Sequence, residues 1–319
     1  MPDIVLHHVF GQEVYAALGT EIREYLADAP FSFALYGPDP WFMYRPVKPR
    51  QGRGRCMHTT KTGEFLHALA FRAKDGTAPR ETFSYLAGFL CHYALDASTH
   101  PYIIWQTTQT WPTKGAHRDL EHALDAAQLR REGRWGEKHP VTDYHLPKIC
   151  LPKAMAEDLD DVYGRIYGWT NLHAALNGCY RRLRAVYRLM EKPHGIAAGV
   201  NKVSASPSLR SYSYTSSAFL DRDVENLSHA PWRQPFDPDI VSTESFREMY
   251  DRARDDAVRM ITDCWRFVRG DGVDEDGLKT SLGRRSYLSG FDWEDPRNQS
   301  VPSLLPPEPE DHKNTDSDR

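Results

Sequence analysis

Three side chains of the kind that bind metal ions recur at intervals of four in the stretch CHYALDASTHPY, residues 91–102. They are His92, Asp96 and His100. On an α-helix, residues four apart lie on the same face, about one turn from each other. The surrounding residues are mostly apolar, and an ionised carboxylate buried among them without a partner would be strongly destabilising. A metal cation is a suitable partner, because imidazole and carboxylate groups are natural zinc ligands.

A second pair with the same spacing follows in HRDLEH, residues 117–122, where His117 and Glu121 are four apart. Such a pair alone would usually form the solvated face of a helix. Together with the first set it predicts a metal site shared between two helices. The set contains no thiolate, so its chemistry does not separate zinc from iron or manganese.

The elements that must position these side chains are helices. Apolar residues recur at helical spacing through most of the chain, and no alternating strand pattern is persuasive, so we expect an all-α fold with the metal cluster between helices. The expected helices cover residues 9–18 (with an extension to 26 left open), 63–74, 79–98, 116–131 and 244–269, with 154–191 forming one helix or two separated near Asn177-Gly178. The expected loops cover residues 38–55, 195–239 and 270–277. One helical domain is expected over 1–295, and the acidic, Pro-rich tail 296–319 is expected to be disordered.

Composition excludes several classes of protein. The 319 residues carry a net charge of −4, so no overall basic field favours nucleic acid. The five cysteines form no CxxC pair, which is typical of reduced thiols in a cytoplasmic protein. The N-terminus has no basic region before an apolar run, and we find no apolar run of membrane-spanning length. We therefore expect a cytoplasmic protein without a signal peptide or transmembrane segment.

The motifs resemble those of the zinc-dependent phospholipase C family, whose superfamily also contains single-strand nucleases. GFLCHYALDASTHPY followed by HRDLE is similar to the family's His-x-x-x-Asp, further His and His-x-x-x-Glu. MPDIVLHHVFGQEV resembles the N-terminus of small bacterial members, YGPDPWF the segment with the family's early Asp, and GRCMHTTKTGEF the segment with its next His. The resemblance covers roughly residues 1–125.

This resemblance implies two or three zinc ions and a ligand for each position. One ion would be held by Asp39, His58, His92 and Asp96, and a second by His100, His117 and Glu121. Asp96 would bridge to a third ion held by His7. In secreted members the mature N-terminal residue also binds that third ion, and here its place would fall to Met1 or Pro2. His8 remains an alternative to His7, and His67 an alternative to His58.

The resemblance also implies hydrolysis of a phosphodiester by a metal-activated water, with Asp39 as ligand and general base. The substrate would be a phospholipid head group, a nucleotide or another small phosphodiester. Aromatic and basic residues near the proposed ligands could contact it: Trp41, Phe42, Tyr44, Trp105, Arg45, Arg50, Arg53 and Arg55. The alternative is a non-catalytic helical protein that uses the metal cluster for structure or for binding a ligand or partner. An enzyme needs a metal with an open position, whereas a structural site is closed.

Overall fold

The structure is a computed structural model that describes residues 3–44, 52–112, 115–191 and 222–300. It is 68% helical, which confirms the all-α prediction. The exception among the described residues is a short antiparallel hairpin of β1 (Trp232–Gln234) and β2 (Asp237–Ser242). The prediction of a continuous loop over 195–239 is therefore wrong at its C-terminal end, and residues 192–221 lie outside the described part.

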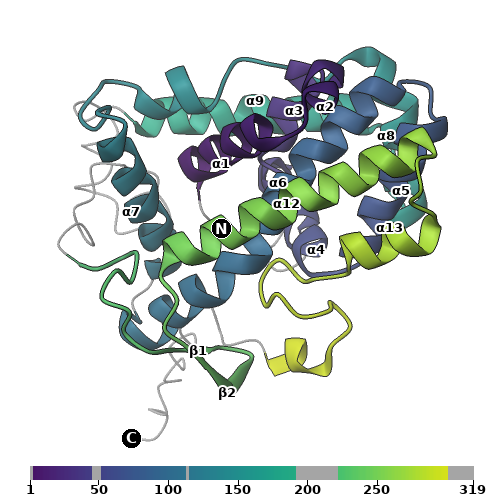
Figure 1. Cartoon of the computed structure of the whole chain (residues 1–319). Helices are drawn as coiled ribbons and strands as arrows, with labels where there is room; N and C mark the ends of the chain where they lie inside the picture. The colour runs from purple at the N-terminus through teal and green to yellow at the C-terminus, as the bar shows by residue number, and fades with distance from the viewer. Residues whose placement is uncertain (1–2, 45–51, 113–114, 192–221, 301–319) are drawn as a thin grey trace, which may run out of the picture.

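Helix α6 (Pro79–Trp105) runs through the centre of the molecule and is buried almost throughout. Four helices pack directly against it: α1 (Ile4–Ala17), α3 (Asp28–Ala34), α5 (Thr62–Asp75) and α12 (Phe246–Arg269). Figure 1 shows α12 lying across the front of α6. Gly88 lets α3 approach closely, since a Cβ there would lie 2.3 Å from the carbonyl oxygen of Phe31. Helix α6, which carries His92, Asp96 and His100, is thus held in place by packing on several sides.

The N-terminus of α6 is capped by a carboxylate from another helix. Asp158, on α8 (Ala156–Tyr167), accepts hydrogen bonds from the backbone N–H groups of Thr77 and Ala78 and from the hydroxyl of Thr82. Burial raises the pKa of Asp158, but these hydrogen bonds outweigh it and lower the pKa below its usual value. Asp158 therefore satisfies backbone donors that the first turn of α6 leaves without partners.

Helix α6 extends beyond its predicted end near Ser98. Pro101 removes the backbone N–H that would bond to the carbonyl of Ala97, yet the helix continues for another turn. Tyr102, Ile103 and Ile104 are fully buried, and their packing favours helix over termination. Because of this extension, His92, Asp96 and His100 lie on one continuous helix.

Three other boundaries differ from the predictions. The segment 38–55 contains a 3-10 turn, η1 (Asp39–Met43), and the start of α4 (Arg53–Thr59), although residues 45–51 are outside the described part. The range 154–191 forms two helices, but they separate at Gly168, which has φ of +72°, rather than at Asn177-Gly178. The predicted loop 270–277 contains the start of a helix, because Asp274 caps α13 (Glu275–Leu282).

The other elements complete the bundle. They are α2 (Thr20–Tyr25), η3 (Gln106–Thr110), α7 (Ala116–Arg131), η4 (Val141–His145), η5 (Lys153–Met155), α9 (Leu172–Met190) and η6 (Pro296–Ser300). The first helix ends before Gly19, and α7 has its predicted bounds. Residues 296–300 form an ordered turn, while 301–319 lie outside the described part. No described helix has the length and apolar character needed to cross a membrane.

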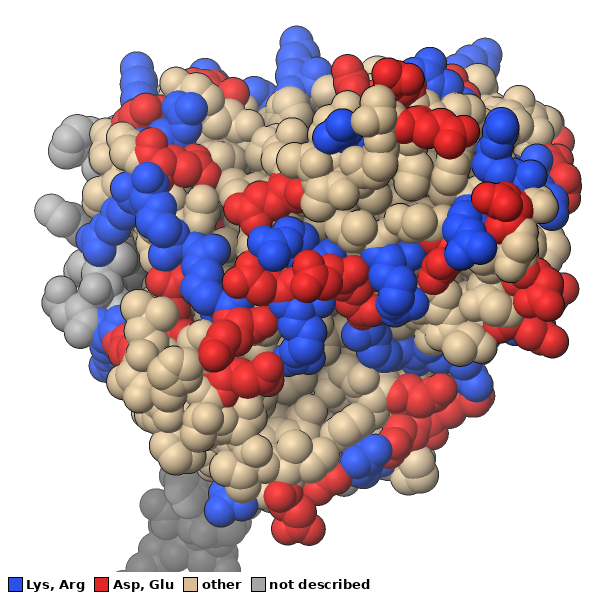
Figure 2. Space-filling model, viewed as in Figure 1, with Lys and Arg blue, Asp and Glu red and all other residues tan. Residues whose placement is uncertain are grey.

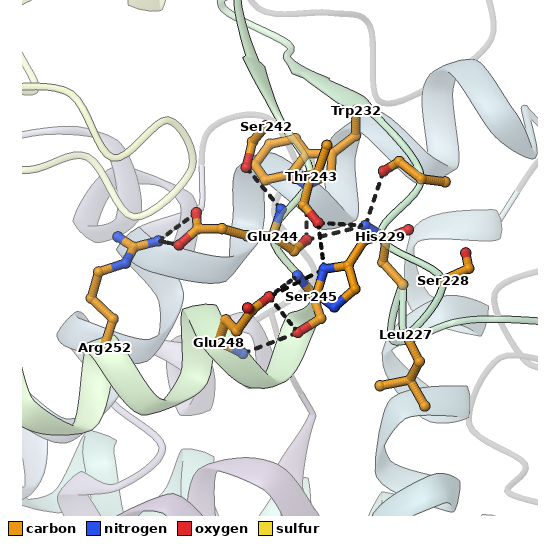
Figure 3. Close-up of polar contacts among 12 residues, drawn as sticks. Leu227, Ser228, His229, Trp232, Ser242, Thr243, Glu244, Ser245, Glu248 and Arg252 are labelled. Carbon is orange, nitrogen blue, oxygen red and sulfur yellow. Dashed lines mark hydrogen bonds and ion pairs between the residues drawn. The ribbon is translucent and has the colours of Figure 1, made fainter.

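Helix α12 begins with a capping box. Ser245 accepts from the backbone N–H of Glu248, and the Glu248 carboxylate accepts from the N–H of Ser245 (Figure 3). The indole N–H of Trp232 donates to the carbonyl of Glu244, which ties the hairpin to the same corner. These contacts explain why the helix starts at Phe246 rather than at Glu244.

Acidic and basic side chains are interspersed on the face of the molecule over α12 (Figure 2).

Candidate metal centre

The eight side chains predicted as ligands converge between α1, η1, α4, α6 and α7. Their donor atoms form three groups in which all atoms lie within 4.8 Å of one another. The groups are His7, His92 and Asp96; Asp39, His58 and His92; and His100, His117 and Glu121. Each group has the size and donor types of a metal site, and His92 belongs to two of them.

Asp96 lies at the middle of this arrangement. One carboxylate oxygen is 3.3 Å from Nε2 of His7, and the other is 3.1 Å from Nε2 of His92. The second oxygen is also 3.7 Å from Nε2 of His58 and 3.7 Å from Nδ1 of His100. One carboxylate thus contacts imidazoles from all three groups, which is the position a bridging ligand requires.

The buried polar atoms at this centre do not satisfy one another by hydrogen bonds, and a cation among them would. His92 and Asp96 have no exposed surface, and among the described residues neither their nitrogens nor their oxygens make a hydrogen bond. The same holds for the ring nitrogens of His7. Burial raises the pKa of Asp96, but the imidazoles of His92 and His100 outweigh it and hold that pKa well below its usual range. A buried carboxylate that stays ionised needs a compensating charge, and a metal ion supplies one.

Asp39 and His58 approach the centre from two short helices. Nε2 of His58 lies 3.3 Å from the Asp39 carboxylate, and Nδ1 lies 2.7 Å from the carbonyl oxygen of Gly54, one turn earlier on α4. A carbonyl only accepts, so Nδ1 carries the proton and Nε2 presents its lone pair to the centre. The alternative, His67, lies elsewhere on α5 with its Nε2 3.7 Å from Glu275, and it belongs to none of the groups.

The third group joins α6 to α7. Nε2 of His117 is 2.8 Å from the Glu121 carboxylate, and the rings of His100 and His117 stack with centroids 5.5 Å apart. Nδ1 of His100 donates to the carbonyl of Tyr287 at 2.8 Å, which fixes the tautomer that leaves a lone pair on Nε2. The i, i+4 pair on α7 therefore faces the last histidine of α6, as its spacing predicts.

Of the two adjacent histidines on α1, the structure brings His7 to the centre. Its ring stacks on His92 with centroids 4.1 Å apart, and burial lowers its pKa to about 4. His8 points toward His145 instead, with ring centroids 5.4 Å apart. The suggested contribution of Met1 or Pro2 lies outside the described residues.

Sequence reasoning missed three residues that help to position the predicted ligands. Asp125, one turn beyond Glu121, accepts from the backbone N–H groups of Val5 and Leu6 at 2.8 and 3.0 Å and so fixes the start of α1. Gly37, with φ of +44°, faces His92 so closely that a Cβ would lie 2.4 Å from the ring. Tyr287 lies far along the chain and carries no local signal, whereas Gly37 stands in a YGPD turn that could have drawn attention.

The side chains of the centre differ in how deeply they are buried. His92 and Asp96 are fully buried, whereas the His117 side chain is 26% exposed and the Asp39 side chain 11% exposed. The centre is therefore least buried at these two residues. A catalytic zinc site needs such an edge, because its metal keeps a position for water or substrate.

Comparison with known proteins agrees with this geometry. The sequence model of the family described as zinc dependent phospholipase C matches residues 7–181, which is more than half of the chain and includes all eight side chains. No curated protein and no solved structure matches the chain. The match confirms the resemblance inferred from the motifs, and the chain belongs to the zinc-dependent phospholipase C family.

Proposed function

We propose that the protein is a zinc-dependent hydrolase that cleaves a phosphodiester in the manner of a phospholipase C. The observation that carries this proposal is the set of three donor groups around Asp96, with partly exposed side chains at Asp39 and His117. The family match supports it independently.

The geometry suggests which residues would hold each ion. Asp39, His58, His92 and Asp96 would hold the first, and His100, His117 and Glu121 the second. His7 would hold the third through its position against Asp96 and His92. Bound zinc acts as a Lewis acid and lowers the pKa of a coordinated water from 15.7 to about 7.

Asp39 is the residue best placed to take a proton from the attacking water. Its side chain is 11% exposed, whereas the Asp96 side chain is fully buried, so Asp39 is the carboxylate of the first group that lies nearer the surface. A general base must lie within hydrogen-bond reach of the proton that it takes, and a water on the first ion would be next to Asp39. The hydrogen bond from His58 to Gly54 would fix the His58 ring, so that its Nε2 lone pair keeps a constant position beside the Asp39 carboxylate.

The surroundings favour a substrate with an apolar part. Phe42 is 48% exposed and its ring lies 5.4 Å from that of His58, so it offers an apolar contact directly beside a proposed ligand. Trp41, in contrast, is buried in the core. The guanidinium of Arg53 packs over the rings of Trp41, Tyr44 and Trp169 at 4.9, 4.1 and 4.6 Å. We therefore favour a phospholipid over a nucleotide.

The test compares products from three substrates in the presence of zinc: a short-chain phosphatidylcholine, a dinucleotide and bis(p-nitrophenyl) phosphate. We expect diacylglycerol and phosphocholine from the lipid, and we expect an Asp39→Asn variant that still binds zinc to lose turnover. Cleavage of the dinucleotide alone would contradict the lipid assignment. Stoichiometric zinc without turnover of any of the three would favour the alternative, a centre that serves structure or ligand binding.

A further inference from the structure

A basic groove lies on a different part of the molecule, between α9 and the segment 138–148. Its cavity measures about 710 Å³. Lys138 and Lys148 line one wall, and Arg181, Arg184 and Arg188 line the other. The three arginines are three and four residues apart, so they share one face of α9. None of these residues belongs to the donor groups of the metal centre.

Four of the five lysines and arginines that line the groove have no acidic partner among the described residues. Arg188 pairs with Asp143 at 2.5 Å, but Lys138, Lys148, Arg181 and Arg184 have no carboxylate within ion-pair distance in the described part of the chain. Elsewhere the pattern is different, and the face over α12 mixes both signs of charge (Figure 2). Because the whole chain has a net charge of −4, this concentration of cations is local.

Glu191 is a buried carboxylate near the groove, and it accepts hydrogen bonds from residues of the groove's own wall. Glu191 accepts from the backbone N–H groups of Val141 and Thr142 at 2.6 and 2.9 Å, and from the Thr142 hydroxyl at 2.5 Å. It holds η4 in place, and its carboxylate lies 3.5 Å from Nδ1 of His139, which also lines the groove. Glu191 therefore offsets part of the positive charge of the groove and leaves the lysines and arginines in excess.

Two of the guanidinium groups are held in position before any ligand arrives. Arg184 donates from Nε to the carbonyl of Leu146 and from Nη2 to the carbonyl of Thr142, both at 3.0 Å. Arg188 donates from Nη1 to the Thr142 hydroxyl at 3.1 Å. Anchored guanidinium groups lose little conformational freedom on binding an anion.

Like charges on two facing walls repel each other, and a multivalent anion between them removes that repulsion. Phosphate groups match this arrangement, because arginine and lysine donate several charge-assisted hydrogen bonds to their oxygens. Leu189, at the edge of the groove, is 52% exposed and offers an apolar contact next to the cations. We propose that this groove binds a phosphomonoester dianion carried on a glyceride-like group, separately from the metal centre.

Two probes distinguish a soluble source of this phosphate from a lipid one. The first is glycerol 3-phosphate, measured by its displacement of the fluorescent anion pyrenetetrasulfonate, whose sulfonates are poor zinc ligands. The second is co-sedimentation with vesicles of phosphatidylcholine containing phosphatidic acid, compared with vesicles of phosphatidylcholine alone. Displacement alone would identify a soluble ligand and selective sedimentation alone a lipid head group, and either supports the proposal.

The deciding variant is the double substitution Lys148→Gln with Arg181→Gln, which removes two exposed charges that make no ion pair among the described residues. We expect it to weaken binding about tenfold, as two exposed charge interactions would. Its control is Lys74→Gln with Arg269→Gln, which changes the net charge equally on α5 and α12. Absence of binding to both probes, or equal loss in the control, would overturn the proposal.

Discussion

The imidazole of His100 donates a hydrogen bond to the carbonyl of Tyr287, a residue 187 positions further along the chain. The backbone N–H of Tyr287 in turn donates to the carbonyl of His58, and its ring lies 5.3 Å from the His58 ring. One residue after α13 therefore contacts the proposed ligands His100 on α6 and His58 on α4. Such outer contacts fix the tautomer and direction of metal-binding imidazoles.

The turn that carries Tyr287 depends on a glycine. Gly290 has φ of +73°, and a Cβ there would lie 2.7 Å from the carbonyl oxygen of Ala97 on α6. We expect Gly290→Ala to displace the turn and to weaken zinc binding at the His100 group by about tenfold, so that less zinc remains after dialysis. Gly270→Ala is the control, because Gly270 has a similar φ of +70° with no atom within 4 Å. Equal zinc content in both variants, measured by elemental analysis, would contradict the positioning role of Tyr287.

Gly37 gives a second test of ligand positioning. We expect Gly37→Ala to push the His92 ring away and to reduce zinc content and phosphodiester turnover together, since a Cβ would meet the ring at 2.4 Å. Gly133→Ala is the control, because Gly133 also has a positive φ of +71° but an added Cβ would have no atom within 4 Å. If both variants retain wild-type metal content, His92 is not held by this contact.

The shared position of Asp96 predicts an unequal effect of two conservative substitutions. Asp96→Asn removes the charge that contacts His7, His58, His92 and His100, whereas Glu121→Gln affects one group. Asp96→Asn should therefore lose more zinc per chain than Glu121→Gln. Equal metal content in the two purified variants would count against a bridging carboxylate.

Asp158 should contribute to stability in a pH-dependent way. Asp158→Asn replaces a carboxylate that accepts from Thr77, Ala78 and Thr82, and we expect it to lower the free energy of unfolding by about 2 kcal/mol at neutral pH. The folded-state pKa lies below the usual aspartate value of 3.8, so this contribution is complete above that value and is lost as the pH falls through the folded pKa.

Urea titrations of the wild type and Asp158→Asn at neutral pH and near pH 3 would measure this difference. Asp161→Asn on the same helix is the control, since its side chain is 41% exposed and pairs with Arg165. A difference that grows on acidification would show that hydrogen bonds to the ionised carboxylate are not its source.

The sequence predicted those parts of the centre that follow from local spacing. His92, Asp96 and His100 share a face because they are four apart on one helix, and His117 with Glu121 follows the same rule. Asp39, His58 and His7 were placed by resemblance, since their approach depends on how separate helices pack. Tyr287 and Asp125 could not be predicted, because their contacts join segments more than 100 residues apart and no local pattern marks them.

The helices, too, were predicted where a local pattern defines them and missed where tertiary packing does. Helical periodicity placed α5, α7 and α12 within about two residues of their observed ends, because each has one apolar face. It ended α6 near Ser98, whereas the helix continues past Pro101 because burial of the residues that follow outweighs the lost hydrogen bond. The short hairpin was missed because β1 has only three residues and β2 is mostly exposed, so neither gives an alternating apolar pattern long enough to recognise.

The central claim is that the eight side chains form a zinc cluster, and the most direct measurement is zinc per chain by elemental analysis of protein purified without added metal. The account predicts two or three zinc ions, removed by a chelator and restored by added zinc, and a lower number in Asp96→Asn. Less than one ion per chain, not restored by added zinc, would contradict it.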